Sequence, residues 1–535
     1  MNARMVALVA GVGFFFLALV TQGVLPFLEP SATTNHVTAV VRNDIGQLKW
    51  MKTSASDYTP LENRGRLVYL REGCWYCHSQ YVRPVTGETR RWGPVSEAGE
   101  YAYDVPHLFG TRRIGPDLTR EGLKYGDEWH LAHFWDPRML TPESIMDPYV
   151  GLFDAPSAAV KIVTDAASGK TLERNAVTEK LFDFASKEQV KLTPNAQGLL
   201  FVPLAAQRRY PVVWTPNNEY AGDRVKLAIE TQDLQALIAY VQKLGMNRGK
   251  WRDLFEPQEM EGSGTSMPRS QEWIDHGKAV YGRRCVGCHG VKGDGNGPAA
   301  TFLYQQRPRN FTQGVFKFRL TKEPLPTDGD MLRTITRGVR GTAMPPWYDL
   351  PLNDRLAVIQ YIKYVLAVDR SDPKKPDQFF VDEPPGEPLY IPTPPPPTMA
   401  MVAHGKEVWV QAKCWECHGE TGKGDGEKAA GLKDDFGFPI PPANLTSGQF
   451  KSGSAVTDIY RTISTGLSGT PMPSFQDSFP DADRWALSYY ILALSAFTDP
   501  LTGQPLKISA ADRAALDNPK LETPGPEQAY GLVQP

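Results

Sequence analysis

Cysteine and histidine side chains recur in one fixed pattern in this sequence of 535 residues. All six cysteines occur as Cys-x-x-Cys pairs, and a histidine directly follows each pair. The three motifs are Cys74, Cys77 and His78; Cys285, Cys288 and His289; and Cys414, Cys417 and His418. In this pattern the two thiols can bond covalently to the vinyl groups of a haem, and the histidine can ligate its iron. The sequence therefore predicts three covalently bound haem c groups, each with a proximal histidine.

Zinc binding and dithiol redox chemistry are the two alternatives for a Cys-x-x-Cys pair. Tetrahedral zinc needs a second pair of ligands, and no second cysteine pair accompanies any of the motifs within its own segment. A redox dithiol does not require a histidine directly after its second cysteine, three times over. Haem attachment explains the whole pattern, and the alternatives explain only parts of it.

Two methionines are candidates for the second iron ligand in the later motifs. A methionine thioether in that position raises the reduction potential and suits electron transfer. Met344 and Met472 follow their motifs at almost the same separation, each in a Thr-x-Met-Pro turn. A single methionine is usually core filler, but equivalent placement in two copies is hard to explain by packing, so we predict that both ligate iron. Ligation by His276 or His404, which precede the motifs, is the alternative.

Spacing alone leaves the second ligand of the first haem open. Met146 lies in a Thr-Pro-Glu-Ser-Ile-Met-Asp-Pro turn, which is the place analogous to the two methionine turns. Met139, His107, His130 and His133 are the other candidates. The last two are three residues apart and share a helical face. Together they could bind a metal, although packing on that face is the commoner role.

Three prolines are candidates for hydrogen-bonding the proximal histidines. Such a histidine usually donates its second ring N–H to an acceptor, which fixes the ring and tunes the iron. Pro116, Pro308 and Pro442 follow the three motifs in similar short contexts. We expect their carbonyl oxygens to be the acceptors, with ordinary turn prolines as the alternative.

Internal repetition in the C-terminal half indicates two copies of one helical unit. HGKAVYGRRCVGCHG from His276 matches HGKEVWVQAKCWECHG from His404, and RTITRGVRGTAMPPW from Arg333 matches RTISTGLSGTPMPSF from Arg461. Each copy closes with an amphipathic helix, over 353–368 and 481–496. In the first motif's segment, helices over 63–72 and 232–244 match the plan of a small c-type cytochrome, in which two such helices cross.

The predicted fold is therefore mainly α, with one N-terminal transmembrane helix followed by three small helical c-type cytochrome domains. We expect a transmembrane anchor at 1–30, a mono-haem domain at 57–245 with an insertion at 154–224, a linker at 246–270, a second domain at 271–368, a Pro-rich linker at 369–398, a third domain at 399–497 and a tail at 498–535. The Pro-rich linker favours extended geometry and a spacer role, with a ligand for a signalling module as the alternative.

The anchor is predicted from an uncharged apolar run over 5–28. Its length suffices to span a bilayer as a helix. The alternative is a cleaved signal peptide, but the run is longer than is usual for one, and no small-x-small cleavage site follows it. Arg4 before the run and Glu29 after it agree with an N-terminus inside and the remaining chain outside.

Composition excludes some function classes. The formal net charge is −2, so no basic balance suggests binding to nucleic acid. No acid–base constellation or nucleotide-binding loop indicates a catalytic centre within the chain itself. The sequence therefore favours a carrier of electrons, in which the haems supply the chemistry.

The first motif region resembles one particular family. The runs REGCWYCHSQYVRP and GTRRIGPDLTREGLKYGDEWHLAHFWDPRMLTPESIMDPY are similar to the mono-haem subunit of cbb3-type haem-copper cytochrome c oxidases. The resemblance covers roughly 1–245 apart from the insertion. The two repeats resemble the generic cytochrome c domain of the family's di-haem subunit, here fused behind the mono-haem domain without a transmembrane helix of their own.

This resemblance implies a function and a set of partners. Cys74 and Cys77 would attach the first haem, and His78 and Met146 would ligate it. The chain would be anchored in the bacterial inner membrane with its haem domains in the periplasm. It would pass electrons from a soluble cytochrome or cupredoxin to a polytopic haem-copper catalytic subunit that reduces oxygen.

Three other functions fit parts of the pattern. Related haem-copper enzymes reduce nitric oxide and use similar cytochrome subunits. Tri-haem cytochromes also serve periplasmic alcohol or aldehyde dehydrogenases, although the oxidase-like run over 71–149 argues against that reading. A free-standing electron shuttle is the third alternative.

Overall fold

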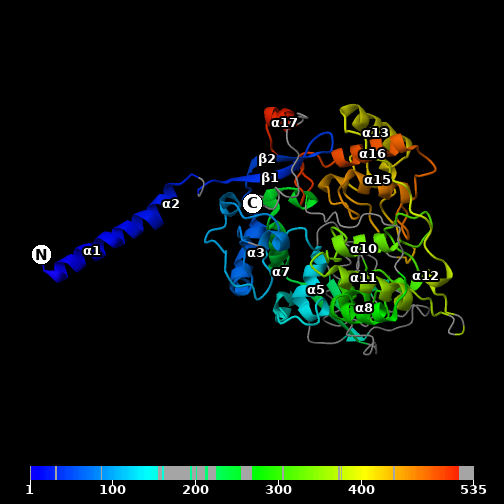
Figure 1. Ribbon diagram of the computed structural model, residues 1–535, viewed down its shortest axis with the longest axis horizontal. Coiled ribbons are helices and arrows are strands. Elements are labelled where there is room, and N and C mark those ends of the chain that lie inside the picture. Colours follow the sequence, from blue (N-terminus) through cyan, green and yellow to red (C-terminus); the bar gives the residue numbers. More distant parts are fainter. Residues whose placement is uncertain are drawn as a thin grey trace.

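The chain is mainly helical, with a few short strands (Figure 1). The computed structural model describes residues 2–30, 33–85, 87–154, 160–161, 193–194, 200–201, 211–214, 224–254, 268–303, 307–371, 374, 376–437 and 440–516. Most of the predicted insertion at 154–224 lies outside these residues. Its described parts are short strands, of which β8 (Arg224–Glu230) pairs antiparallel with β3 (Phe153–Asp154), β4 (Val160–Lys161) and β7 (Pro211–Trp214), and β5 (Thr193–Pro194) pairs with β6 (Leu200–Phe201).

The N-terminal helix extends away from the rest of the molecule (Figure 1). It consists of α1 (Ala3–Ala18), a π-helical turn η1 (Leu19–Val24) and α2 (Leu25–Leu28). This continuous stretch has 26 residues, an 18-residue part of it has a mean hydropathy of 2.2, and none of it is buried. In the described part of the chain it is the one helix long and apolar enough to cross a membrane, and it fits the predicted anchor.

A β-hairpin follows the anchor, at a place where the sequence analysis assigned no element. Strands β1 (His36–Arg42) and β2 (Leu48–Ser54) pair antiparallel, and a turn at Gly46 with a positive φ joins them. The hairpin packs against the residues that follow the first domain, because Lys250 N donates to the Val40 carbonyl oxygen at 2.8 Å. The last four of the seven residues of β1 are all buried.

Three helix pairs form the framework of the haem regions. Helix α3 (Pro60–Arg71) crosses α7 (Gln232–Lys243), α8 (Gln271–Arg284) crosses α11 (Leu352–Tyr361), and α13 (Met399–Gln411) crosses α16 (Asp481–Ala493). The predicted helices at these places are therefore confirmed, with ends shifted by a few residues. The first helix begins at Pro60 rather than at residue 63, because Thr59 and Glu62 form a capping box in front of it.

Each crossing is made close by a glycine at an equivalent place. A Cβ atom on Gly65, Gly277 or Gly405 would lie 1.8, 2.0 or 2.1 Å from a carbonyl oxygen of the opposite helix, so only glycine permits the approach. An aromatic pair also spans each crossing. The pairs are Tyr69 and Tyr240, Tyr281 and Tyr361, and Trp409 and Tyr490, with ring centroids 5.4, 5.3 and 5.7 Å apart. The three regions share one structural plan.

Shorter helices connect these pairs. They are η2 (Cys74–Tyr76), α4 (Glu88–Trp92), η3 (Ala98–Tyr101), α5 (Asp127–Trp135), η4 (Pro137–Met139), η5 (Val150–Leu152), η7 (Met246–Arg248), η8 (Trp251–Leu254), α9 (Val286–His289), η9 (Pro298–Thr301), η10 (Phe311–Gln313), α10 (Asp328–Arg337), η11 (Ile362–Leu366), α12 (Phe379–Asp382), α14 (Trp415–His418), η12 (Leu445–Ser447), α15 (Val456–Thr465) and α17 (Ala510–Leu516).

The Pro-rich segment and the tail both lie against the helical regions. Leu389 N donates to the Leu320 carbonyl oxygen at 2.8 Å, and the Tyr489 hydroxyl donates to the Pro395 carbonyl oxygen at 2.6 Å. The segment thus runs from the second region to the third, as a spacer would. The described part of the tail ends in α17, where Leu516 is buried against the hairpin residue Val41.

Candidate haem-binding sites

Each proximal histidine donates a hydrogen bond to a backbone carbonyl. The Nδ1 atom of His78 lies 2.8 Å from the carbonyl oxygen of Pro116, as predicted. The prediction of proline acceptors is wrong for the other two motifs. His289 Nδ1 lies 3.1 Å from the carbonyl oxygen of Arg309, and His418 Nδ1 lies 3.2 Å from that of Ala443, one residue after the proline in each case.

A capping side chain explains why the acceptor is the residue after proline in the repeats. The acceptor always directly precedes an Asp or Asn whose side chain accepts from the backbone N–H two residues further on. These residues are Asp117, Asn310 and Asn444, which accept from Thr119, Thr312 and Thr446 at 2.9, 2.9 and 3.0 Å. This Asx turn fixes the direction of the preceding carbonyl. The shared Asp/Asn-x-Thr spacing was the sequence signal that could have found it.

Burial keeps the proximal histidines neutral. It lowers the pKa of His78 and of His418, and it lowers the pKa of His289 to about 4, in each case against the opposing effect of the carbonyl hydrogen bond. Because Nδ1 carries the proton donated to the carbonyl, Nε2 holds a free lone pair. A neutral imidazole in this tautomer is the form that ligates iron.

Four of the six motif cysteines have a raised thiol pKa. Burial raises the pKa of Cys74, Cys285, Cys288 and Cys414 to about 12. Zinc ligation and dithiol redox chemistry both use thiolates, which a raised pKa disfavours. Among the described residues, no group of three or more His, Cys, Asp or Glu side chains is placed to hold a metal ion.

The two Thr-x-Met-Pro turns have the same hydrogen bonds. The backbone N–H groups of Met344 and Met472 each donate a hydrogen bond to Oγ1 of the threonine two residues earlier, at 3.0 and 3.2 Å. The carbonyl oxygens of the same methionines accept from Val339 N and Leu467 N at 3.0 and 3.1 Å. Both methionines are thus held at the same point of the same loop, and each is partly buried.

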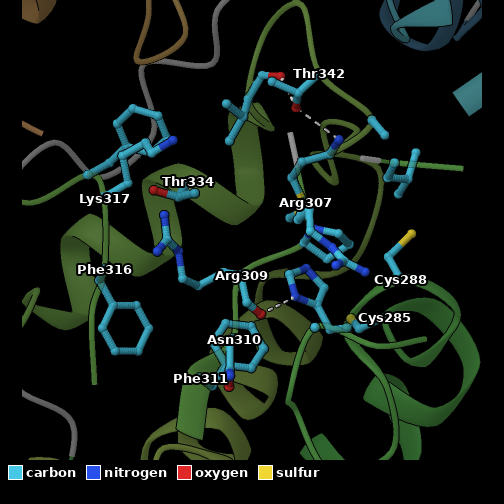
Figure 2. Close-up of a pocket in the computed structure, with 18 of the residues that line it drawn as sticks. Cys285, Cys288, Arg307, Arg309, Asn310, Phe311, Phe316, Lys317, Thr334 and Thr342 are labelled. Carbon is cyan, nitrogen blue, oxygen red and sulfur yellow. Dashed lines mark hydrogen bonds between the residues drawn. The ribbon is translucent and has the colours of Figure 1, made fainter. Parts of the chain in front are cut away.

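A large cavity lies at the second motif. It has a volume of about 1090 Å³, and Cys285, Cys288, His289 and Met344 all line it. Figure 2 shows the two cysteines on one side of this cavity and Phe316 and Lys317 on the other. The predicted attachment residues and both predicted ligands of this haem therefore converge on one space.

The charges around this cavity also fit a haem. Haem is an apolar macrocycle with two propionate carboxylates, and the cavity is lined by Arg307, Arg309 and Lys317 in addition to its apolar side chains. Burial, with Lys451 and Arg309 nearby, lowers the pKa of Lys317 to about 7. Several cationic side chains face this one space, so a bound anionic group would stabilise their charged forms.

At the first motif, Met146 packs against the hydrophobic cluster that contains Cys74, as do Trp75 and Tyr149. Met139 is a buried member of the same cluster, so packing alone does not separate these two candidates. The ring of His107 stacks on Phe109 with a centroid distance of 4.9 Å, and Met139 is buried in η4.

The two histidines of α5 lie in an aromatic cluster, where His130 is buried and His133 is partly buried. His130 is 2% exposed, and its Nε2 has no hydrogen-bond partner among the described residues. His133 stacks on Trp129. These contacts agree with the packing role expected for this helical face.

The histidines that precede the later motifs lie at the helix crossings. His276 Nε2 and His404 Nε2 each lie 2.8 Å from a carboxylate oxygen, of Asp354 and Asp483 respectively. Their side chains are half exposed, and neither residue lines the cavity of the second motif. Their positions favour a role in joining the two crossing helices rather than ligation.

Comparison with known families covers most of the described chain. The family "Cytochrome C oxidase, mono-heme subunit/FixO" matches residues 37–247, and "Cytochrome C oxidase, cbb3-type, subunit III" matches residues 272–362. The general family "Cytochrome c" matches residues 402–495. No curated protein matches the chain.

Among solved structures, a chain of the Kuenenia stuttgartiensis reducing HAO-like protein complex Kustc0457/Kustc0458 is 37% identical to this one. The match covers 44% of this chain and 99% of that chain, with a TM-score of 0.38.

These families bind haem c covalently, and the two oxidase families act with a haem-copper catalytic subunit in a membrane complex. The first family matches the region directly behind the apolar N-terminal helix, and the other two match the repeats. The chain is thus a membrane-anchored, FixO-like electron-transfer subunit of cbb3-type cytochrome c oxidase, fused to further cytochrome c domains.

Proposed function

We propose that the chain carries three haem c groups and conducts electrons from a soluble donor to the oxygen-reducing subunit. Each haem is attached through the two cysteines of its motif, and the ligand pairs are His78 with Met146, His289 with Met344, and His418 with Met472. The haem iron supplies a reversible one-electron change of oxidation state. The donor is a soluble cytochrome or cupredoxin on the periplasmic side of the bacterial inner membrane.

The observation that carries this proposal is that the same arrangement surrounds the histidine of all three motifs. Each motif follows the first helix of a glycine-mediated crossing, and each histidine donates to the carbonyl before an Asx turn. Before any electron arrives, the chain's own residues fix the orientation and the tautomer of each histidine ring. They also fix the loops that carry Met344 and Met472. Fixed ligands reduce the rearrangement that accompanies a change of iron charge, as electron transfer requires.

The order of transfer follows from the position of the first domain. It directly follows the anchor and is the region that matches the mono-haem oxidase subunit. The first haem therefore delivers electrons to the catalytic partner. The second and third haems receive them from the donor.

Counting the haems tests the stoichiometry. Pyridine haemochrome analysis of the purified chain should give three covalently bound haems. Two haems would show that one motif is silent, and substituting both cysteines of each motif in turn would identify it.

Methionine variants test the ligands. Met344→Leu, Met472→Leu and Met146→Leu should each abolish the Met–iron absorption band of one haem and lower its reduction potential, because the thioether favours the ferrous iron. Met331→Leu and Met139→Leu change buried methionines of the second and first clusters and should leave the bands intact. Retention of all bands in a ligand variant would refute that assignment.

Co-purification separates the possible acceptors. A partner that carries haem b and copper supports oxygen reduction, whereas haem b with non-haem iron indicates nitric oxide reduction. Stopped-flow mixing with a reduced soluble cytochrome or cupredoxin then tests the donor. Reduction of the haems in the absence of any other component is the expected result.

A further inference from the structure

Helix α5 joins the first and second haem sites. In Figure 1 it lies between the helix pair α3 and α7 and the helix pair α8 and α11. At its start, Gly126 N donates to the carbonyl oxygen of Thr342, in the loop of Met344, at 3.2 Å. Just after its end, the Met139 carbonyl oxygen packs so closely on Gly287 that a Cβ there would lie 2.0 Å away. One short segment of the first domain thus touches both the distal loop and the attachment motif of the second haem.

A column of stacked rings runs along this segment. Tyr125 and Trp129 have ring centroids 3.8 Å apart and planes 7° apart. Trp129 and His133 follow with centroids 4.5 Å apart and planes 16° apart. Tyr125 and Trp129 also line the cavity of the second motif. One end of the column therefore faces the second haem site.

The other end of the column lies at the first haem site. The ring of His133 contacts that of Phe134, with centroids 5.8 Å apart, and Phe134 belongs to the hydrophobic cluster that includes Cys74. Trp129 packs against the hydrophobic cluster that includes Cys74, and Met146 packs against the same cluster. Trp129 thus contacts the surroundings of both haem sites.

We propose that the stacked rings of Tyr125, Trp129 and His133 form the electron-transfer contact between the second and first haems, with Trp129 as the central ring. This inference rests on the proposed presence of both haems. With both haems bound, His289 would hold the iron that gives up one electron and is oxidised from ferrous to ferric, and His78 would hold the iron that accepts this electron and is reduced from ferric to ferrous. No proton or co-reactant is consumed.

The physical basis is tunnelling through dense matter. The probability that an electron crosses between two centres falls steeply with distance, and it falls faster across gaps than through closely packed atoms with delocalised orbitals. Parallel rings at these separations leave no gap between successive members of the column. An aliphatic side chain in place of Trp129 leaves less matter and no π orbital at the centre of the column.

The test uses the complete oxidase complex containing Trp129→Leu. The fully reduced complex, with carbon monoxide on the oxygen-reducing centre, is photolysed in the presence of oxygen, and oxidation of the c-type haems is followed by absorbance. The first haem should be oxidised at the wild-type rate. Oxidation of the remaining c-type haems should become several-fold slower, while redox titration gives unchanged reduction potentials.

Trp135→Leu is the matched control, because Trp135 is a buried tryptophan of the same helix whose ring contacts Phe153 and Phe302. This variant should keep the wild-type rates, and Trp129→Phe, which retains an aromatic ring, should stay close to them. Oxidation of the remaining c-type haems at the wild-type rate in Trp129→Leu would overturn the proposal. Equal slowing in Trp129→Leu and Trp135→Leu would also overturn it, since packing alone would then be responsible.

A second variant covers the case in which Trp129→Leu does not assemble. His133→Leu removes the terminal ring of the column and should slow the same phase. Wild-type rates in this variant would again contradict the proposal. Failure of the proposed function gives a different result, because no c-type haem would then be oxidised after photolysis even in the wild-type complex.

Discussion

The two junctions between neighbouring haem domains are built from different kinds of side chain. Between the first and second domains, aromatic rings on α5 stack from one site toward the other. Between the second and third domains, Arg333 and Arg337 of α10 bind the carboxylate of Asp458 in α15, whose side chain is fully buried. In Figure 1, α15 lies beside α10. Stacked rings mark the first junction, which also holds the backbone hydrogen bond from Gly126 to Thr342, whereas ion pairs mark the second.

The repeat makes the second junction easy to interpret. Asp458 and Asp330 occupy equivalent third positions in α15 and α10, and both accept hydrogen bonds from the start of their own helix. Asp458 additionally binds two arginines of the neighbouring domain. A capping residue of the repeated unit thus also joins the two copies in the third domain. Ion pairs of fixed geometry set orientation, whereas stacked rings bring two sites into close contact.

The largest effect is expected from Asp458→Asn. The change replaces the charged carboxylate that binds two largely buried guanidinium groups with a neutral amide, and breaking a buried ion pair costs about 3–5 kcal/mol. Differential scanning calorimetry of the full chain should show a clearly lower melting temperature for the third domain. Asp330→Asn is the matched control at the equivalent position, where loss of a helix cap costs about 1 kcal/mol. An equal loss of stability in the two variants would contradict the larger contribution assigned to Asp458.

A smaller effect is expected from Gly287→Ala at the first junction. The added Cβ would meet the Met139 carbonyl oxygen at 2.0 Å, and overpacking of this kind costs about 1–3 kcal/mol. Chemical denaturation should detect the loss. Glu416 occupies the equivalent place in the third motif, where it pairs with Lys428 at the surface. Glu416→Ala should therefore have only a marginal effect, and a loss as large as that of Gly287→Ala would show that the motif, not the junction, is sensitive.

The smallest effect is a pH dependence at a helix crossing rather than at a junction. Hydrogen bonds to Asp483 and Glu407 raise the pKa of His404. Their contribution is therefore fully present below the unfolded pKa of about 6.5, and it is lost as the pH rises through the raised pKa of the folded protein. Thermal melts of the third domain across this range should show a small decline in stability. A decline of the same size in His404→Gln would disprove the assignment to this group.

The sequence was sufficient for the parts of the sites that local spacing determines. The cysteine motifs, the equivalent methionine turns, the first pair of crossing helices and the closing helices of the two repeats could all be predicted, because each depends on residues close together in the chain or on comparison of the two copies. The acceptor of His289 was misassigned to Pro308. The direction of a carbonyl depends on the Asx turn that follows it, and proline attracts attention without controlling that turn.

Contacts between domains could not be predicted in the same way. The ring column of α5 consists of residues with ordinary helical spacing, and nothing in their spacing shows that a second haem site lies beside them. The ion pairs of Asp458 join residues more than a hundred positions apart, and many arginines could have been its partners. Such contacts arise only when the folded units meet.

The hairpin of β1 and β2 has a consequence for the maturation of the chain. Its Val41 is covered by Phe497 and Leu516 from the far end of the sequence, its Arg42 pairs with Asp253, and Arg513 of α17 binds Asp44. Asp253 lies before the second and third cysteine motifs, whereas Phe497, Arg513 and Leu516 follow all three. During synthesis the hairpin can therefore gain its contact with Asp253 early, but the cover over Val41 forms only after the third motif has emerged.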